Sequence, residues 1–374
     1  MSDMEYKRLS DCATWVKDRT CDINYESYIS TENMIKDKGG VIIASSLPDS
    51  KTASAYSPND ILLSNIRPYF RKIWYADKNG SCSNDVLVVR ADEDIDSKFL
   101  YYVLSDNNFF NYDTVTSKGT KMPRGTQTAI MKYLVPDINV GKQRKIADIL
   151  SAYDNLIENN NKRIHLLEQM AENLYKEWFV RFRFPGYEDV EFIDGFPKEW
   201  KICRMDQLAK IKAGGDAPAD STKELTDECS IPIYSNGIEN EGLYGYTSKA
   251  KISKPSITIS ARGTVGYTCL RRVHYTPIVR LICIIPHEEK LANWLYYYFK
   301  RTIVIANGTS QQQITIPMMS REKVLFPTED LINKFYDYST AYLDEMDGLK
   351  EQNSNLEKQR DLLLPRLMSG KLEV

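Results

Sequence analysis

The feature that most constrains the fold is a seven-residue apolar repeat in the middle of the chain. Residues 145–179 read KIADILSAYDNLIENNNKRIHLLEQMAENLYKEWF. Core-compatible residues recur there at alternating steps of four and three, the pattern of a coiled-coil seam. The seam positions are Ile146, Leu150, Tyr153, Ile157, Asn160, Ile164, Leu167, Ala171, Leu174 and Trp178. Because a helix of about 40 residues is roughly 60 Å long and cannot cover its own seam, the sequence predicts a second long helix.

The C-terminal part of the chain supplies that second helix. A similar apolar pattern occurs at Leu331, Phe335, Tyr338, Tyr342, Met346, Leu349, Asn353, Leu356, Arg360, Leu363 and Leu367. The step from Tyr342 to Met346 adds a residue, which predicts a register shift at that point. Near the end, Pro365 is expected to kink or stop the helix because proline lacks the backbone N–H and clashes with the preceding turn.

Both predicted seams contain polar residues. A buried asparagine such as Asn160 or Asn353 can fix the register of a coiled coil at some cost in stability. The alternative at the first site is that Asn159, Asn160 and Asn161 form a weak, solvated stretch of helix, and the sequence does not decide between the two. Arg360 can lay its alkyl stem along the seam while its charged head stays in water.

The chain also repeats itself. Residues 119–136, GTKMPRGTQTAIMKYLVP, are similar to residues 308–327, GTSQQQITIPMMSREKVLFP, and KFLYYVL at 98–104 matches NWLYYYF at 293–299. The offset is roughly 190 residues. Short β-branched and aromatic runs bounded by turn formers predict strands within 60–76 and 81–91, with counterparts within 256–270 and 276–286.

These patterns predict an α+β fold with an internal pseudo-twofold duplication. Two β-rich globular domains are separated by two long helices, which we expect to pair as an antiparallel coiled coil. The predicted boundaries are residues 1–140 and 184–327 for the globular domains, with helices in 141–183 and 328–374. A Pro- and Gly-containing linker, RFPGYEDVEFIDGFPKEW, follows the first helix.

Composition limits the compartment and the chemistry. The formal net charge is −2, so a nucleic-acid partner would need local basic patches. The seven cysteines include no Cys-x-x-Cys pair and only three histidines are present, which argues against a zinc site and a disulfide framework. We therefore expect a cytoplasmic protein, and the absence of an apolar run of about 18 residues predicts no membrane span.

Four stretches together resemble the specificity subunit of Type I restriction-modification enzymes. They are GKQRKIADILSAYDNLIENNNKRIHLLEQMAENLYKEWFVRF, GTKMPRG, YISTENM and LLLPRLMSGKL, and the resemblance extends over essentially the whole chain, including its duplication. It implies that each globular domain is a target recognition domain that reads one half of a bipartite, asymmetric site in double-stranded DNA. It implies that the helices set the spacer between the half-sites and dock two methyltransferase (modification) subunits.

The resemblance also implies the remaining partners and the division of chemistry. Two restriction/translocase subunits complete the complex, and S-adenosylmethionine, ATP and Mg are bound by partner subunits, so no cofactor is expected in this chain. Adenine-N6 methylation and ATP-dependent cleavage belong to those partners. A non-catalytic chain should lack catalytic motifs. MSGKLE has Leu372 where a phosphate-binding loop needs a hydroxyl, and NIRPYF only echoes the tetrapeptide of amino-methyltransferases. We predict no catalytic and no metal-binding residue.

The first globular domain carries two basic clusters that could contact DNA. Phosphates are bound by Lys and Arg, and base edges are read by Arg, Lys, Asn and Gln on accessible loops. NIRPYFRK and SKGTKMPRG combine such residues with an aromatic ring and glycines. A solvated surface is the more common role for any single lysine, but clustering favours contact. The candidates are Arg67, Tyr69, Arg71, Lys72, Lys118, Lys121 and Arg124.

The second globular domain has glutamines where the first has basic residues. Gln suits the N6/N7 edge of adenine, which favours an A-containing half-site. The loops SARGTVG and SNGIENEGLYGYTSK supply further polar side chains. The candidates here are Gln311, Gln312, Gln313, Arg262, Thr264, Asn236 and Lys249.

Two other functional classes stay open at this point. A two-headed coiled-coil adaptor that binds proteins and not DNA is compatible with the near-zero net charge. An enzyme with an unrecognised active site is disfavoured by the scarcity of histidine and by the lack of a spaced acid/base cluster.

Overall fold

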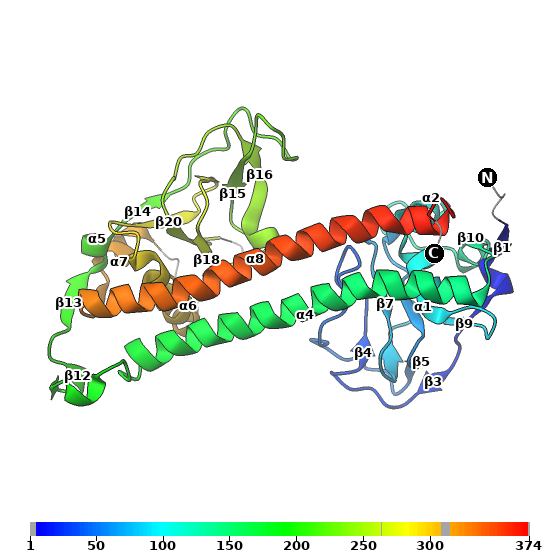
Figure 1. Cartoon of the computed structure of the whole chain (residues 1–374), viewed down its shortest axis with the longest axis horizontal. Coiled ribbons are helices and arrows are strands. Elements are labelled where there is room, and N and C mark those ends of the chain that lie inside the picture. Colours follow the sequence, from blue (N-terminus) through cyan, green and yellow to red (C-terminus); the bar gives the residue numbers. More distant parts are fainter. Residues whose placement is uncertain (1–4, 263, 308–314, 373–374) are drawn as a thin grey trace. The chain divides into compact units, whose positions relative to one another are not determined.

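The computed structural model describes residues 5–262, 264–307 and 315–372 and shows an α+β chain. The chain forms two compact units: unit 1 comprises Met1–Asn160 with Glu351–Val374, and unit 2 comprises Asn161–Lys350. Two long helices, α4 (Val140–Phe179) and α8 (Glu329–Met368), each contribute one half to each unit (Figure 1). The predicted pair of long helices is confirmed. We call the rest of unit 1 head 1 and the rest of unit 2 head 2.

In unit 1, the first half of α4 lies antiparallel to the second half of α8. The Asn160 side chain donates to Asn353 Oδ1 at 2.9 Å, and one and a half turns earlier on α4 Asp154 accepts from Arg360 at 2.6 Å. Residue numbers thus fall along α8 as they rise along α4. Asn160 and Asn353 are both buried, so a polar pair occupies the seam here.

In unit 2, the second half of α4 lies antiparallel to the first half of α8. Arg163 donates to Glu345 at 2.6 Å, and further along α4 the Trp178 ring lies 6.1 Å from the Phe335 ring. The predicted seam of α4 is correct throughout the helix, because each of its ten positions is buried or half-buried.

Two details of the second helix differ from prediction. Tyr338 was placed in the seam but is 55% exposed, and Ser339, which is fully buried, takes the inward position. Asn293 donates to Ser339 Oγ at 2.9 Å, so a hydrogen bond to head 2 selects the smaller polar side chain for this position. The register therefore shifts earlier than the Tyr342 to Met346 step.

The helix also does not stop at Pro365 but continues to Met368. A proline three residues from the end removes a single backbone hydrogen bond. The buried side chains of Leu364, Leu367 and Met368 hold the last turn in the core of unit 1. The amide of Ser369 donates to the Pro365 carbonyl at 3.1 Å, so the turn closes over the proline.

Local sequence explains where α4 begins. The Asn139 side chain accepts a hydrogen bond from the Lys142 amide at 2.9 Å, which satisfies one of the free amides of the first turn. After α4 ends, Phe182 has a positive φ of 56° and Pro185 follows, so the helix cannot continue.

Head 1 contains two four-stranded sheets with strand orders β2-β9-β6-β7 and β3-β5-β8-β4, and a separate β1-β10 pair. Its strands are β1 (Tyr6–Arg8), β2 (Ala13–Trp15), β3 (Arg19–Thr20), β4 (Tyr28–Ile29), β5 (Ala53–Tyr56), β6 (Ile61–Ser64), β7 (Ile73–Tyr75), β8 (Gly80–Cys82), β9 (Val86–Ala91) and β10 (Leu134–Pro136). Its helices are η1 (Leu9–Asp11), η2 (Pro68–Phe70), α1 (Ser97–Ser105), α2 (Asn107–Thr116) and α3 (Gln127–Ile130).

Head 2 repeats this arrangement with strand order β14-β20-β17-β18, a three-stranded sheet β16-β15-β19 and a β13-β21 pair. Its strands are β13 (Lys201–Arg204), β14 (Ala209–Ala213), β15 (Ile231–Tyr234), β16 (Leu243–Thr247), β17 (Ser256–Ile259), β18 (Thr268–Arg271), β19 (Thr276–Pro277), β20 (Ile282–Pro286) and β21 (Lys323–Phe326). Its helices are α5 (Met205–Leu208), η4 (Glu239–Gly242), α6 (Leu291–Asn307) and α7 (Ile316–Arg321).

The duplication predicted from sequence is therefore present in the order of elements. In each half, a short first strand pairs with the strand that precedes the long helix, and the four-stranded sheet has the same connectivity. The matched sequences at 98–104 and 293–299 lie in α1 and α6. The strands expected at 60–91 and 256–286 are also found.

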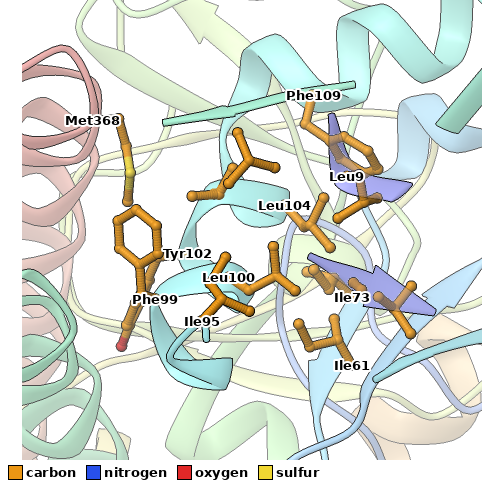
Figure 2. Close-up of a cluster of buried hydrophobic side chains, with 14 of the residues drawn as sticks. Leu9, Ile61, Ile73, Ile95, Phe99, Leu100, Tyr102, Leu104, Phe109 and Met368 are labelled. Carbon is orange, nitrogen blue, oxygen red and sulfur yellow. The ribbon is translucent and has the colours of Figure 1, made fainter. Parts of the chain in front are cut away.

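The core of each unit joins its sheet to its halves of the long helices. In unit 1, residues of β6, β7, β9 and α1 pack with Ile146 and Leu150 of α4 and with Leu367 and Met368 of α8. Figure 2 shows Met368 at the edge of this cluster with Phe99 and Tyr102 of α1. Because apolar burial is the main source of stability, each head is seated on the helices by its own core.

The linker after α4 is structured and belongs to unit 2. It contains η3 (Tyr187–Asp189) and a small hairpin of β11 (Phe192–Ile193) and β12 (Phe196–Pro197). Phe184 and Trp200 at its two ends stack at 5.7 Å and are buried in the unit 2 core.

Candidate nucleic-acid interface

The predicted basic turn of head 1 is held in an unusual backbone conformation. Arg67 and Arg71 flank the 3-10 helix η2 with positive φ angles of 52° and 50°. Tyr69 lies between them and is 48% exposed. Non-glycine residues rarely adopt this left-handed region, and such strain gathers at functional sites. The turn therefore presents an aromatic ring between two arginines.

The second basic segment lies directly against this turn. The Arg67 amide donates to the Pro123 carbonyl at 2.8 Å, and Lys118 and Arg124 exchange backbone hydrogen bonds of 2.9 Å that close the loop between them. Lys118, Lys121 and Arg124 are exposed. The structure thus brings the two basic clusters of head 1, far apart in sequence, into one surface.

Several of these cations already have partners within unit 1. Arg124 pairs with Asp85 at 3.1 Å, and Lys72 donates to the Thr31 carbonyl at 2.5 Å. The Arg67 guanidinium and the Lys72 ammonium each lie 5.9 Å from the Phe70 ring centroid. The turn is thus stiffened by its own basic residues, and DNA contact by them stays a prediction.

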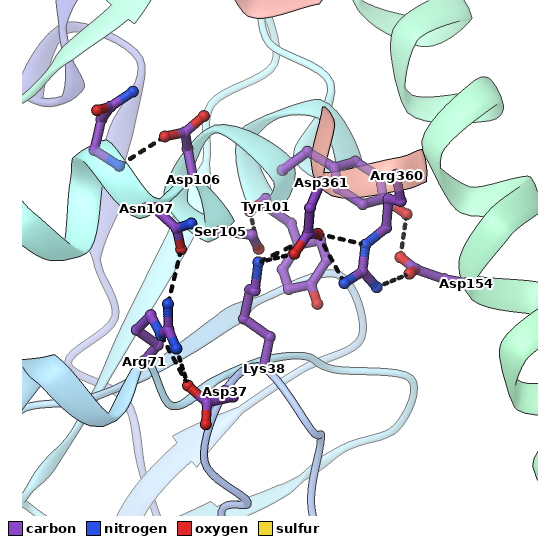
Figure 3. Close-up of polar contacts among 12 residues, drawn as sticks. Asp37, Lys38, Arg71, Tyr101, Ser105, Asp106, Asn107, Asp154, Arg360 and Asp361 are labelled. Carbon is purple, nitrogen blue, oxygen red and sulfur yellow. Dashed lines mark hydrogen bonds and ion pairs between the residues drawn. The ribbon is translucent and has the colours of Figure 1, made fainter. Parts of the chain in front are cut away.

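The Arg71 side chain has two partners of its own within unit 1. Its guanidinium forms a short ion pair with Asp37 and donates to Asn107 at 3.3 Å (Figure 3). The backbone amides of Asp37 and Lys38 donate to the carbonyls of Phe70 and Arg71 at 2.9 Å. The geometry gives Arg71 a structural role at the base of the turn.

A buried polar cluster that the sequence did not reveal lies beneath the same loop. Asn65 Oδ1, Asp113 Oδ1 and Arg67 Nε are buried and have no hydrogen-bond partner among the described residues. A Cβ at Gly125 would lie 2.6 Å from Asp113 Oδ1 and 3.2 Å from Asn65 Oδ1, so a larger residue there would push these side chains aside. Burial raises the pKa of the Asp113 carboxyl to about 6.

In head 2, the structure joins two of the predicted loops. The Asn236 side chain donates to the Val279 carbonyl at 2.7 Å and accepts from the Ala261 amide at 2.8 Å. Asn236 thereby holds the loop of the exposed residues Arg262 and Thr264 against its own. Both polar atoms of the Asn236 side chain take part in these two hydrogen bonds. Asn236 therefore stabilises the loop that carries Arg262.

The other head 2 candidates lie apart or outside the described structure. Lys249 is exposed on a separate turn, where its carbonyl accepts from the Thr276 hydroxyl at 2.8 Å. Gln311, Gln312 and Gln313 lie outside the described residues. Their suggested adenine readout stays a prediction.

The described residues contain neither a metal-ligand cluster nor a membrane-spanning helix. No group of three or more His, Cys, Asp or Glu side chains there could hold a metal ion. No helix within the same residues is both long and apolar enough to cross a bilayer.

Comparison with known proteins gives the family. A model of the Type I restriction modification DNA specificity domain matches residues 1–169 and 197–341, once in each half of the chain. The chain belongs to this family. The family resemblance predicted from the four sequence stretches is confirmed, and family membership gives no support to an adaptor that does not bind DNA.

Individual relatives of this specificity-family chain are similar along most of their length. The Type I restriction enzyme MjaIX specificity subunit of Methanocaldococcus jannaschii is 25% identical over 74% of this chain and 69% of its own. The HindI specificity subunit of Haemophilus influenzae is 24% identical, with 100% of both chains covered. A crystal structure of the Type-I restriction-modification system S subunit from M. genitalium has a TM-score of 0.62 at 17% identity and covers 98% of this chain and 97% of that one, which shows the shared fold.

Proposed function

We propose that this chain is the subunit that gives a Type I restriction-modification complex its DNA sequence specificity, with each head reading one half of a bipartite site. The observation that carries the proposal is the duplication of one recognition fold with different loop chemistry. Head 1 presents Lys118, Lys121 and Arg124 on its loop, whereas the corresponding sequence of head 2 is GTSQQQ. Different side chains on one repeated frame are what two different base readouts require.

The paired helices would set the spacer. Half-sites read from one face of B-DNA lie about 34 Å, one helical turn, apart. Each long helix has 40 residues, which corresponds to about 60 Å. We propose that the buried Asn160–Asn353 hydrogen bond fixes the register of the two helices, because a slip would break this bond within an apolar seam.

The chemistry would belong to partner subunits. We propose two methyltransferase subunits docked on the helices and two restriction/translocase subunits, which bring S-adenosylmethionine, ATP and Mg and carry out adenine-N6 methylation and ATP-dependent cleavage. This chain would perform no covalent step itself. A cytoplasmic location fits a chromosomal DNA substrate and seven cysteines that are all free thiols.

A domain exchange tests the two-reader model. Residues 1–140 are replaced by the matching domain of another specificity subunit, and methylated adenines are mapped by single-molecule sequencing in cells that also make the methyltransferase subunit. We expect one half-site to change while the other half-site and the spacer stay as they were. The reciprocal exchange of residues 184–327 serves as the matched control and should change only the other half. A change in both halves, or in neither, would contradict the model.

A further inference from the structure

An ion pair joins head 1 to the C-terminal helix within unit 1. The Lys38 ammonium lies 3.5 Å from both carboxylate oxygens of Asp361 on α8. The Lys38 side chain is only 11% exposed. Burial lowers the pKa of this ammonium and Asp361 partly opposes that effect. A buried lysine needs such a partner, because an unpaired charge in this setting is costly.

The same carboxylate continues into a chain of charges that reaches the other helix. Asp361 accepts from Arg360 at 3.0 Å, and Arg360 donates to Asp154 of α4 at 2.6 Å. Asp154 also accepts from the Tyr102 hydroxyl of head 1 at 2.6 Å. Figure 3 shows Lys38, Asp361, Arg360 and Asp154 as one connected line of contacts. Polar contacts thus join head 1 both to α4, through Tyr102 and Asp154, and to α8, through Lys38 and Asp361.

The other end of this line is the strained basic turn. Lys38 follows Asp37, and the amides of both residues donate to the carbonyls of Phe70 and Arg71. Asp37 and Lys38 have positive φ angles of 57° and 64°, as do Arg67 and Arg71 on the facing segment. Left-handed residues with a Cβ persist only where their surroundings hold them in place. The segment of Asp37 and Lys38 is hydrogen-bonded to the basic turn, and Lys38 also pairs with Asp361 of α8. These contacts form a rigid connection from the helix to the turn.

From this geometry we propose that Lys38, Asp361, Arg360 and Asp154 are positioning residues that fix the turn carrying Arg67 and Tyr69 relative to the helix pair. We call these four residues the orienting clamp. The inference rests on the proposed DNA-reading function and deepens it: the clamp sets where the first reader meets the DNA relative to the spacer. Its loss widens the range of spacers that the complex accepts at the first half-site without changing the bases that are read.

In unit 2, ion pairs also join the head to α8. Arg272, which directly follows β18, forms an ion pair of 2.7 Å with Asp347 of α8 and a shorter one with Asp344. In both units, a cation of the head meets aspartates of α8. The clamp of head 1 is the better defined, because Lys38 is nearly buried and leads directly to the candidate reading turn.

The test uses Lys38→Met and Asp361→Asn in the full complex with its methyltransferase subunits. Methylation is measured on duplexes whose spacer is one base pair shorter, unchanged or one base pair longer. We expect discrimination against the altered spacers to fall about tenfold in either variant, the size of a broken contact pair. The double variant Lys38→Met with Asp361→Asn loses little more discrimination than either single variant, because both changes remove the same contact. Lys51→Met, at an exposed lysine of the same head, is the matched control and leaves it unchanged.

The salt dependence of DNA binding separates positioning from direct contact. A lysine that binds a phosphate contributes about −0.9 to the slope of log affinity against log salt. Lys38→Met should leave that slope unchanged. Unaltered spacer discrimination, or a slope that drops by one phosphate contact, would overturn the inference. Failure of the proposed function is a different result, in which the unmodified complex shows no bipartite site at all.

Discussion

Replacing Phe335 with alanine is expected to lower the free energy of unfolding by about 4 kcal/mol, within the usual range for a buried phenylalanine. Phe335 is fully buried in the unit 2 core. Its ring lies 5.0 Å from Phe179, 6.0 Å from Tyr297 and about as far from Tyr175 and Trp178. The residue therefore joins α4, α6 and α8, and its removal leaves a cavity that three packed elements cannot close.

Tyr338→Ala is the matched control for this change. It removes an aromatic side chain of the same helix, less than one turn away, but one that is 55% exposed. Its ring lies 5.9 Å from the Trp178 ring. We expect a loss below about 1 kcal/mol, as for exposed positions generally. Urea denaturation measures both variants, and equal losses would show that the seam of α8 is not the one described here.

Replacing Asp113 with asparagine is expected to stabilise the protein at pH 8 by about 3 kcal/mol. The pKa of the buried carboxyl rises from the usual 3.8 to about 6 because burial disfavours its charged form. Above pH 6 the folded protein must keep a charged carboxylate whose buried Oδ1 has no hydrogen-bond partner among the described residues. Asparagine removes this charge, and its amide can donate toward the unpartnered Asn65 Oδ1.

The sign of the pH dependence follows from the direction of the shift. A carboxyl with a raised pKa in the folded state destabilises that state at high pH, and the cost disappears below the usual pKa of 3.8. The advantage of the variant should therefore be full above pH 7 and fall to about half at pH 5. Asp77→Asn, at an exposed aspartate of the same head, should change stability by less than about 0.5 kcal/mol. An advantage for Asp113→Asn that does not vary with pH would contradict the assigned cause.

Much of the architecture could be predicted because it depends on periodic patterns. The heptad pattern of α4 predicts which face of the helix is buried, and the matched sequences around residues 98 and 293 indicate the duplication. The second helix was harder. The pattern of Phe335, Tyr338 and Tyr342 favours an aromatic seam, but Asn293 of head 2 bonds the inward Ser339, and no periodicity shows a contact from another element.

The candidate interface was predicted only by region. The sequence identifies Arg67, Arg71 and Arg124 as clustered basic residues. It does not show that Arg71 is hydrogen-bonded to Asp37 or that Arg124 forms an ion pair with Asp85. Asparagine is a residue type that can read bases, and the structure shows that the Asn236 side chain joins two backbone segments. Base contact by Asn236 stays a prediction. The Lys38–Asp361 pair joins residues 323 positions apart, a separation at which only the folded structure carries information.

One measurement tests the central claim, that two readers are held at a separation set by the helices, most directly. One heptad is inserted into α4 after Asn160 and one into α8 before Asn353, which keeps the antiparallel pairing continuous. Methylated adenines are then mapped in cells that make the methyltransferase subunit. Since one heptad adds about 10 Å, the account predicts both original half-sites with a spacer longer by up to about three base pairs. Both half-sites at the original spacing would contradict it.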